Sequence, residues 1–144
     1  MNYTQTQFRI RYSETDGMGY VYHGNYASFY HAARTDFLRE KGISEKQMEL
    51  DGIIMPVISL NQRFVKPVRF DELITIRTYV EKMTQTRLVF RFEIFNDQQQ
   101  LVNRADSTVV FVDSTSRKPL RAPEQLQNKL NISTGISSTE TCHV

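Results

Sequence analysis

The 144-residue sequence contains a single cysteine, Cys142, the third residue from its C-terminal end. One cysteine excludes a disulfide framework within the chain, and a reducing compartment is the simpler interpretation. No apolar run approaches the roughly 20 residues that a membrane-spanning helix requires. Residues 1–11 alternate between polar and apolar types and lack the continuous apolar segment of a secretory signal. We therefore expect a cytoplasmic protein without a membrane span.

The sequence also has little excess of positive or negative charge. Its formal net charge is only +2, and no block of five or six Lys and Arg residues occurs. This balance gives no support for a nucleic-acid partner. The sequence has no Gly-x-Ser-x-Gly motif, which argues against an α/β-hydrolase. It also has no His, Cys and carboxylate spacing that is typical of a zinc site, so no metal site is predicted.

The spacing of apolar residues predicts one domain over residues 1–130 and a flexible Ser/Thr-rich tail over residues 131–144. A helix is expected at 25–41, because five residues recur on one helical face: Tyr26, Phe29, Tyr30, Ala33 and Phe37. Strands are expected at 5–12, 53–66, 73–82, 87–96 and 101–112, with short helices at 44–50 and 122–130. The class is therefore α+β: a five-stranded antiparallel sheet wrapped around one long central helix.

Helix boundaries are indicated by capping residues. Asn25 is a candidate N-cap of the long helix, and Gly42 stands where a C′ glycine would end it. Ser44, followed three residues later by Gln47, predicts a capping box for the next short helix.

The segment between the first strand and the long helix carries the candidate chemistry. It places Asp16 shortly after a strand, then a glycine-bearing turn, then a helix N-terminus with unpaired backbone N–H groups. Such N–H groups stabilise an oxyanion, and a nearby carboxylate can serve as nucleophile or base. These are the minimum requirements for acyl transfer, although the same residues also suit an ordinary Asx turn.

The motif in this segment resembles the signature of the 4-hydroxybenzoyl-CoA thioesterase family, and most closely its Tol–Pal-associated acyl-CoA thioesterases. The matching residues are Tyr12-Ser13-Glu14-Thr15-Asp16-x-x-Gly19-x-Val21-Tyr22-His23-x-Asn25-Tyr26, Ala33-Arg34 and Phe64-x-x-Pro67-x-Arg69-Phe70-Asp71. The resemblance covers about residues 5 to 125. It implies a hotdog fold, hydrolysis of an acyl-CoA thioester, and no cofactor or metal.

The resemblance also implies roles for individual residues. Asp16 matches the catalytic aspartate, acting either as a nucleophile that forms an anhydride or as a base that activates water. His23 matches the residue whose backbone N–H polarises the thioester carbonyl, and Tyr12 matches a tyrosine near that site. For Tyr12, a place in the core or in a hydrogen-bonded scaffold is the alternative.

Further residues are expected to contact substrate. Those at the start of the helix would shape the pocket: Gly24, Asn25, Tyr26 and Phe29. Arg63 and Lys66 would contact the phosphates of CoA, or else lie on a solvated sheet edge. The resemblance further implies a homodimer or homotetramer with the active site between subunits. The alternatives are a hotdog hydratase or dehydratase and a non-catalytic acyl-CoA-binding module.

Overall fold

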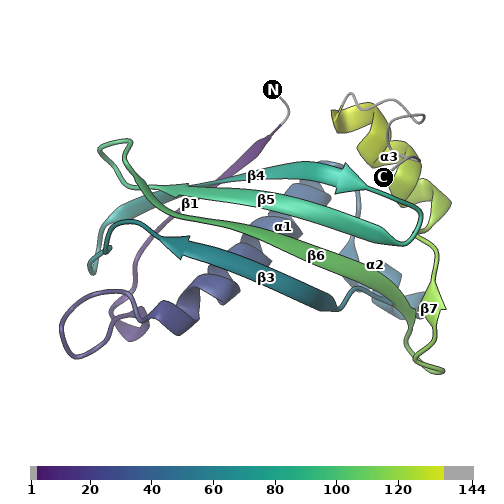
Figure 1. Cartoon of the computed structure of the whole chain (residues 1–144), viewed down its shortest axis with the longest axis horizontal. Coiled ribbons are helices and arrows are strands. Elements are labelled where there is room, and N and C mark those ends of the chain that lie inside the picture. The colour runs from purple at the N-terminus through teal and green to yellow at the C-terminus, as the bar shows by residue number, and fades with distance from the viewer. Residues whose placement is uncertain (1–2, 135–144) are drawn as a thin grey trace.

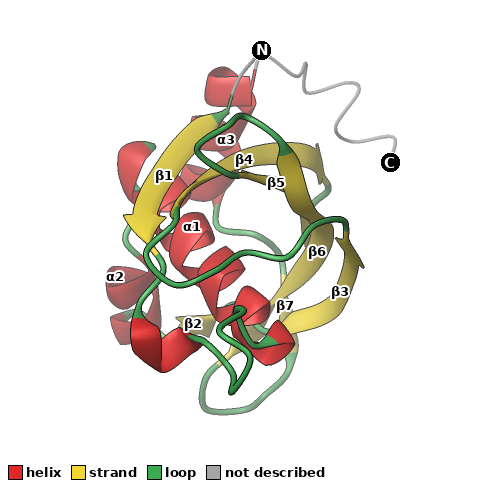
Figure 2. Cartoon of the chain, turned by 90° about the vertical axis from the view of Figure 1, so that its left-hand side faces the viewer, coloured by secondary structure: helices red, strands yellow, loops and turns green. Residues whose placement is uncertain are grey.

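The computed structural model describes residues 3–134, with side chains up to residue 130. One long helix, α1 (Tyr26–Glu40), lies against the concave face of a curved antiparallel sheet, as Figures 1 and 2 show. The five long strands are arranged in the order β1-β4-β5-β6-β3. They are β1 (Thr4–Arg9), β3 (Val57–Phe64), β4 (Leu73–Met83), β5 (Arg87–Phe95) and β6 (Leu101–Asp113). The expected α+β arrangement is confirmed.

The central strands form because apolar residues alternate along them. In β5 every second side chain, Leu88, Phe90, Phe92 and Ile94, is at most 1% exposed. This alternation places one face of the sheet against α1 and leaves the other face polar. Asn96 closes the β5–β6 hairpin, because its Oδ1 accepts hydrogen bonds from the N–H groups of Gln98 and Gln100, each at 3.0 Å.

Helix α1 buries the predicted face, including Tyr26, Phe29 and Phe37, against the sheet. It ends at a Lys41 cap followed by Gly42, which has the positive φ of +80° expected of a C′ glycine. Asn25 occupies the predicted N-cap position of α1, but its side chain does not cap the helix. Asn25 already has a helical backbone in the short 3₁₀ helix η2 (His23–Asn25), and its side chain accepts no capping hydrogen bond.

Two strands are too short to show any periodicity of their own; one was missed, and the other lies within the longer strand expected over 53–66. β2 (Ile53–Ile54) and β7 (Pro119–Leu120) both pair with β6 and extend the sheet to seven strands. Pro56 separates β2 from β3, which divides the single strand expected over 53–66. The first strand ends at Arg9 and not at residue 12, because the chain turns into the 3₁₀ helix η1 (Tyr12–Glu14).

Two shorter helices complete the fold. Ser44 caps α2 (Glu45–Leu50), since its hydroxyl accepts a hydrogen bond from the N–H of Gln47 at 3.1 Å, but the predicted capping box is incomplete, because the Gln47 side chain donates to Asp51. α3 (Glu124–Thr134) runs four residues beyond its expected end, and the rest of the expected tail, 135–144, lies outside the described residues. Within residues 3–134, no helix combines the length and the hydropathy needed to cross a bilayer.

Candidate active site

The loop between β1 and α1 folds as a small hairpin. Thr15 pairs with Val21 across it, and the N–H of Asp16 donates to the carbonyl of Tyr20 at 2.7 Å. Gly19 makes the turn with φ of +85°, a conformation that side-chain-bearing residues rarely adopt. The hairpin fixes the backbone at Asp16 and brings it opposite the segment that leads into the helix.

The Asp16 side chain is oriented by its own turn. Its Oδ1 accepts hydrogen bonds from the N–H groups of Met18, at 2.8 Å, and Tyr20, at 3.2 Å. Oδ2 has no hydrogen-bond partner among the described residues, and Asp16 is exposed in the single chain. One carboxylate oxygen therefore holds the geometry, while the other is available to a reacting group.

The loop is tied to the start of the helix through Glu14. Its carboxylate accepts from the N–H of Arg11 and from the Arg11 guanidinium, both at 2.7 Å. Its backbone carbonyl accepts from Nδ2 of Asn25, at 2.8 Å, and from the N–H of Tyr22, at 2.9 Å. Asn25 therefore fastens the loop to the helix entry.

A second set of contacts ties the loop to the sheet side. The Arg69 guanidinium lies over the Tyr20 ring, 4.5 Å from its centroid, and donates to the Tyr20 hydroxyl at 2.7 Å. The N–H of Val21 donates to the carbonyl of Val68 at 2.8 Å. In the sequence, Arg69 was identified only as part of the family motif, so this structural role was missed. Tyr20 and Arg69 form an isolated β-bridge outside the strands. Such a bridge has no periodic apolar pattern by which the sequence could predict it.

The helix begins with two backbone donors that have no partner. The N–H groups of His23 and Gly24 make no hydrogen bond within the described part of the chain, whereas those of Asn25 and Tyr26 bond to Tyr22 and His23. At Gly24 a Cβ atom would lie 2.5 Å from Cε2 of Tyr22, so a larger residue would require this half-exposed ring to shift. The entry to the helix is thus shaped to leave two N–H groups free.

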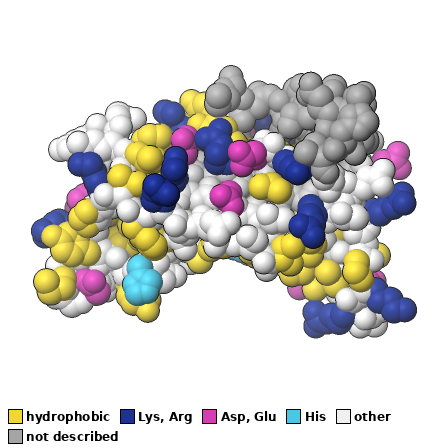
Figure 3. Space-filling model, in the orientation of Figure 1, with side chains coloured by type: hydrophobic (Ala, Val, Ile, Leu, Met, Phe, Trp, Pro, Cys, Tyr) yellow, Lys and Arg dark blue, Asp and Glu magenta, His cyan; other side chains and the backbone are white. Residues whose placement is uncertain are grey.

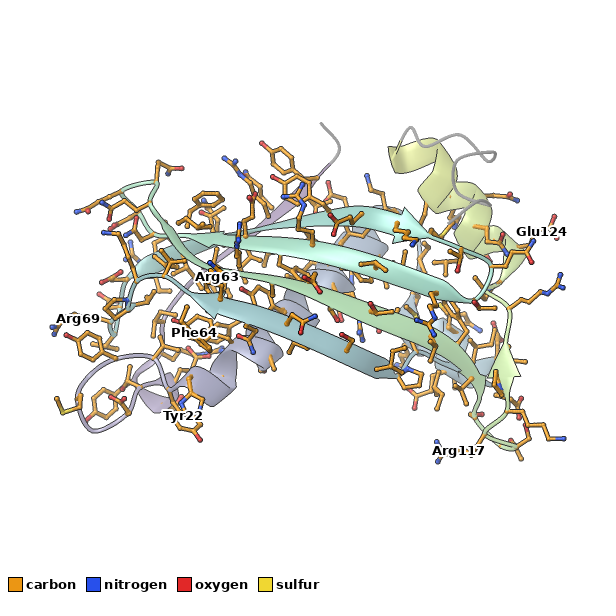
Figure 4. All side chains as sticks on the ribbon, in the orientation of Figure 1. Tyr22, Arg63, Phe64, Arg69, Arg117 and Glu124 are labelled. Atoms are coloured by element: carbon orange, nitrogen blue, oxygen red, sulfur yellow. The ribbon has the colours of Figure 1, made fainter. Side chains whose placement is uncertain are left out.

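An open depression of about 310 Å³ lies beside these donors. Its lining is Val21, His23, Tyr26, Phe64, Val65, Lys66 and Pro67. Figure 4 shows Phe64 at the end of β3, above the helix entry where Tyr22 lies. Burial, and to a smaller extent the charge of Glu72, raises the pKa of Tyr26 to about 12, so its phenol stays neutral. The depression is therefore mostly apolar, with one lysine at its rim.

The structure brings together some predicted site residues and separates others. His23, Tyr26 and Lys66 line the depression, and Gly24 and Asn25 lie in the helix entry beside it. Asp16 is outside this lining, in the hairpin whose Thr15 pairs with Val21.

Three predicted residues lie elsewhere. Tyr12 is 76% exposed and packs edge-on against Phe70 at 5.7 Å, so its alternative assignment to the core is wrong. Phe29 is 3% exposed behind Tyr26, where it packs as core. Arg63 lies on the outer face of the sheet, in a separate groove with Arg104 and Glu93, because neighbouring strand residues point to opposite faces.

Comparisons with known proteins agree with this geometry. Residues 10–130 match the family model described as the thioesterase-like superfamily. The acyl-CoA thioester hydrolase YbgC of Escherichia coli is 34% identical over 82% of this chain and 88% of its own length. The putative acyl-CoA thioesterase YneP of Bacillus subtilis is 31% identical over 84% of this chain and 88% of its own.

Among solved structures, the DHNA-CoA thioesterase from Staphylococcus aureus superposes with a TM-score of 0.90 at 33% identity, covering 94% of this chain and 93% of that one. The fold and the loop thus define a hotdog protein of the thioesterase class. The chain belongs to the thioesterase-like superfamily, as its motif predicted.

Proposed function

We propose that this protein hydrolyses an acyl-CoA thioester to a carboxylic acid and CoA, with Asp16 as the catalytic carboxylate. The observation that carries the proposal is the hairpin that orients Asp16 and leaves its Oδ2 free, immediately before a helix entry with two free N–H groups. Family membership and the similarity to YbgC support the same reaction. Carboxylate and donors together meet the needs of acyl transfer.

The proposed reaction depends on stabilising the negative charge that develops on the thioester carbonyl oxygen. The thioester carbonyl oxygen would lie at the N–H groups of His23 and Gly24, which stabilise the developing oxyanion by about 3 kcal/mol per donor. Asp16 either attacks the carbonyl carbon and forms an anhydride, or removes a proton from the attacking water. In both routes the C–S bond breaks, the thiolate of CoA leaves and takes a proton, and one water is consumed. Thiolates are good leaving groups, which favours the nucleophilic route.

The active site is proposed to lie between two copies of the chain. β3 pairs with β6 on one side and has no strand on its other side among the described residues. Both ends of this edge carry half-exposed apolar side chains: Val57, Ile58, Phe64 and Val65. Figure 3, in the orientation of Figure 1, shows a lower border hollowed between two projecting ends. An exposed apolar edge strand of this kind favours pairing with another chain.

Antiparallel pairing of two β3 edges would join the sheets and place the partner's Val57 beside Phe64. That contact would cover the open depression and enclose the acyl group. A homodimer, or a homotetramer of two such dimers, is therefore proposed.

We place the enzyme in the cytoplasm as one hotdog domain over residues 1–130. The phosphates of CoA would contact Lys66 at the rim of the depression.

A panel of acyl-CoAs tests the reaction by thiol release. Release of free thiol with formation of the carboxylic acid is expected. Hydration of an enoyl-CoA without thiol release would instead identify a hydratase, and tight acyl-CoA binding with neither reaction would identify a binding module.

The subunit arrangement is tested with Ile58→Glu, which places charge on the free β3 edge. Sedimentation should show a monomer. Thiol release by this monomer should be strongly reduced. Leu50→Glu is the matched control, because Leu50 is 72% exposed at the end of α2, outside β3. A fully active Ile58→Glu monomer would contradict the shared site.

A further inference from the structure

Residues 68–70 hold the hairpin of the candidate active site against the rest of the chain. The N–H of Val21 donates a hydrogen bond to this segment at 2.8 Å, and the carbonyl of Gly19 accepts one from it at 3.4 Å. Between these two bonds, Tyr20 and Arg69 form a β-bridge, and the Arg69 side chain adds its own contacts to Tyr20. The position of Tyr20 therefore depends on this segment.

Tyr20 is joined to Asp16 by two hydrogen bonds of opposite direction. The N–H of Asp16 donates to the carbonyl of Tyr20 at 2.7 Å, and the N–H of Tyr20 donates to Oδ1 of Asp16 at 3.2 Å. The second donor to Oδ1 is the N–H of Met18, at 2.8 Å, which belongs to the same turn. A shift of Tyr20 would therefore move both the backbone and the carboxylate of Asp16.

Arg69 fixes the Tyr20 side chain at two points. Its guanidinium lies 4.5 Å from the centroid of the ring and donates to the hydroxyl at 2.7 Å (Figure 4 labels Arg69). A planar guanidinium that stacks on a ring and also bonds its hydroxyl allows that ring few positions. Arg69 is exposed and forms no ion pair within residues 3–130, so its hydrogen bond and its ring contact both go to Tyr20.

We propose that Arg69 is a positioning residue for the Asp16 carboxylate and that it acts through Tyr20. This inference rests on the proposed thioesterase function, because it concerns the carboxylate assigned to that reaction. A displacement of about 1 Å can lower the rate of a positioned reaction about a hundredfold. Without Arg69, only backbone contacts would hold an exposed hairpin in place. The carboxylate would then lose its orientation while the fold persists.

Two other roles for Arg69 predict different kinetic results. An exposed arginine three residues from Lys66, which lines the depression, would also suit a phosphate of CoA. Loss of such a contact weakens substrate binding uniformly, so it raises KM and leaves kcat unchanged. A contact that serves only stability lowers the melting temperature and leaves both kinetic constants unchanged. A positioning role lowers kcat and leaves KM nearly unchanged.

Arg69→Gln tests these roles with two thioesters of the same acyl group. One is the preferred acyl-CoA, and the other is the N-acetylcysteamine thioester, which carries no phosphate. On the acyl-CoA, kcat should fall at least about tenfold, with KM changed by less than about twofold. On the N-acetylcysteamine thioester, kcat/KM should fall by the same factor, because the positioning of Asp16 does not depend on the phosphates.

Two further variants provide the comparison. Arg69→Lys keeps the charge and loses the planar fork, so its kcat should lie between those of the wild type and Arg69→Gln. Arg77→Gln is the matched control, because Arg77 also stacks on a ring, that of Phe95 at 4.8 Å, but lies in β4. This control should keep the wild-type kcat.

A double variant tests the route through Tyr20. In Tyr20→Leu the ring that Arg69 holds is absent, so the additional change Arg69→Gln should lower kcat no further. Effects of the two substitutions that multiply would show that Arg69 acts independently of Tyr20, and would contradict the proposed route.

The possible failures are distinguishable. No thiol release from any acyl-CoA by the wild type would overturn the proposed function, and the role of Arg69 with it. Thiol release by the wild type with an unchanged kcat in Arg69→Gln would overturn the role of Arg69 alone. In that case, a higher KM confined to the acyl-CoA would identify a phosphate contact, and a lower melting temperature with unchanged kinetic constants would identify a purely structural contact.

Discussion

The helix–sheet core and the loop over residues 12–25 are held together by different forces. In the core, large apolar side chains such as Phe37, Phe90 and Phe111 are at most 1% exposed. In the loop, Val21 is the one buried apolar residue, and most other contacts are hydrogen bonds such as those of Glu14, beside the ring contacts of Tyr12 and Tyr20. Stability therefore comes mainly from the core. Substitutions in the loop should cost less folding free energy than substitutions in the core.

The largest loss of stability is expected from Phe90→Ala. This ring is fully buried, edge-on to Phe37 at 5.8 Å and stacked on Phe92 at 5.9 Å. Its removal leaves a cavity, so the free energy of unfolding should fall by about 3–5 kcal/mol. Denaturant titration measures this change. A loss below about 1 kcal/mol would show that the core does not carry the stability assigned to it.

The next largest effect should come from an ion pair at the border of the core. Arg34 is 4% exposed, and its Nη2 donates to Oε2 of Glu45 at 3.1 Å. Thr35 donates to the other oxygen of the same carboxylate at 2.7 Å. Glu45→Ala leaves the Arg34 charge buried without its anion, which should cost about 3 kcal/mol. Glu49→Ala, exposed on the same short helix, is the control, and equal melting temperatures of the two variants would contradict the prediction.

Alkaline pH should weaken the core through its buried tyrosines. The pKa of Tyr26 is raised to about 12 in the folded state by burial, while an unfolded tyrosine ionises near its ordinary pKa of 10.0. Between these values the unfolded chain has lost a proton that the folded chain keeps. Stability contributed by the neutral phenol is therefore complete below pH 10 and falls above it, by about 1.4 kcal/mol per pH unit.

Unfolding curves at several pH values test this linkage. Tyr26→Phe should flatten the decline between pH 10 and pH 12. Tyr30, whose pKa is also raised by burial, should contribute in the same direction. An identical pH dependence in wild type and Tyr26→Phe would show that this phenol is not the group responsible.

The smallest change in stability, about 1 kcal/mol, is expected in the loop, for Asn25→Ala. This variant removes the hydrogen bond from Nδ2 of Asn25 to the carbonyl of Glu14. Because the bond positions the helix entry, thiol release should fall at least tenfold although the fold persists. Asn96→Ala, in the β5–β6 turn, provides the comparison: it should lose similar stability and keep its rate. Equal rates of thiol release in both variants would contradict the positioning role of Asn25.

The contrast between core and loop also explains what the sequence could predict. Helix α1 and strands β4, β5 and β6 were predicted to within one residue at either end, because burial imposes regular apolar periods on them. The loop has no apolar period, so its motif could predict a role for Asp16 but not the contacts around it. The Arg69–Tyr20 pair joins residues 49 positions apart, and only coordinates reveal it.

Local geometry accounts for the remaining errors. Asn25 was expected to cap α1, but the preceding 3₁₀ turn had already begun the helix. Arg63 was grouped with Lys66 by its nearness in sequence, although strand alternation places Arg63 on the outer face. Two-residue strands such as β2 depend on their partner β6 and not on their own sequence.

The role of Asp16 is tested most directly by Asp16→Asn, which keeps the size of the side chain and removes its charge. Thiol release from the preferred acyl-CoA should fall at least a hundredfold, with the free energy of unfolding nearly unchanged, because nucleophile and base are both lost. Asp97→Asn, in the exposed β5–β6 turn, should keep the wild-type rate. Undiminished turnover by a folded Asp16→Asn protein would contradict the assignment of this carboxylate.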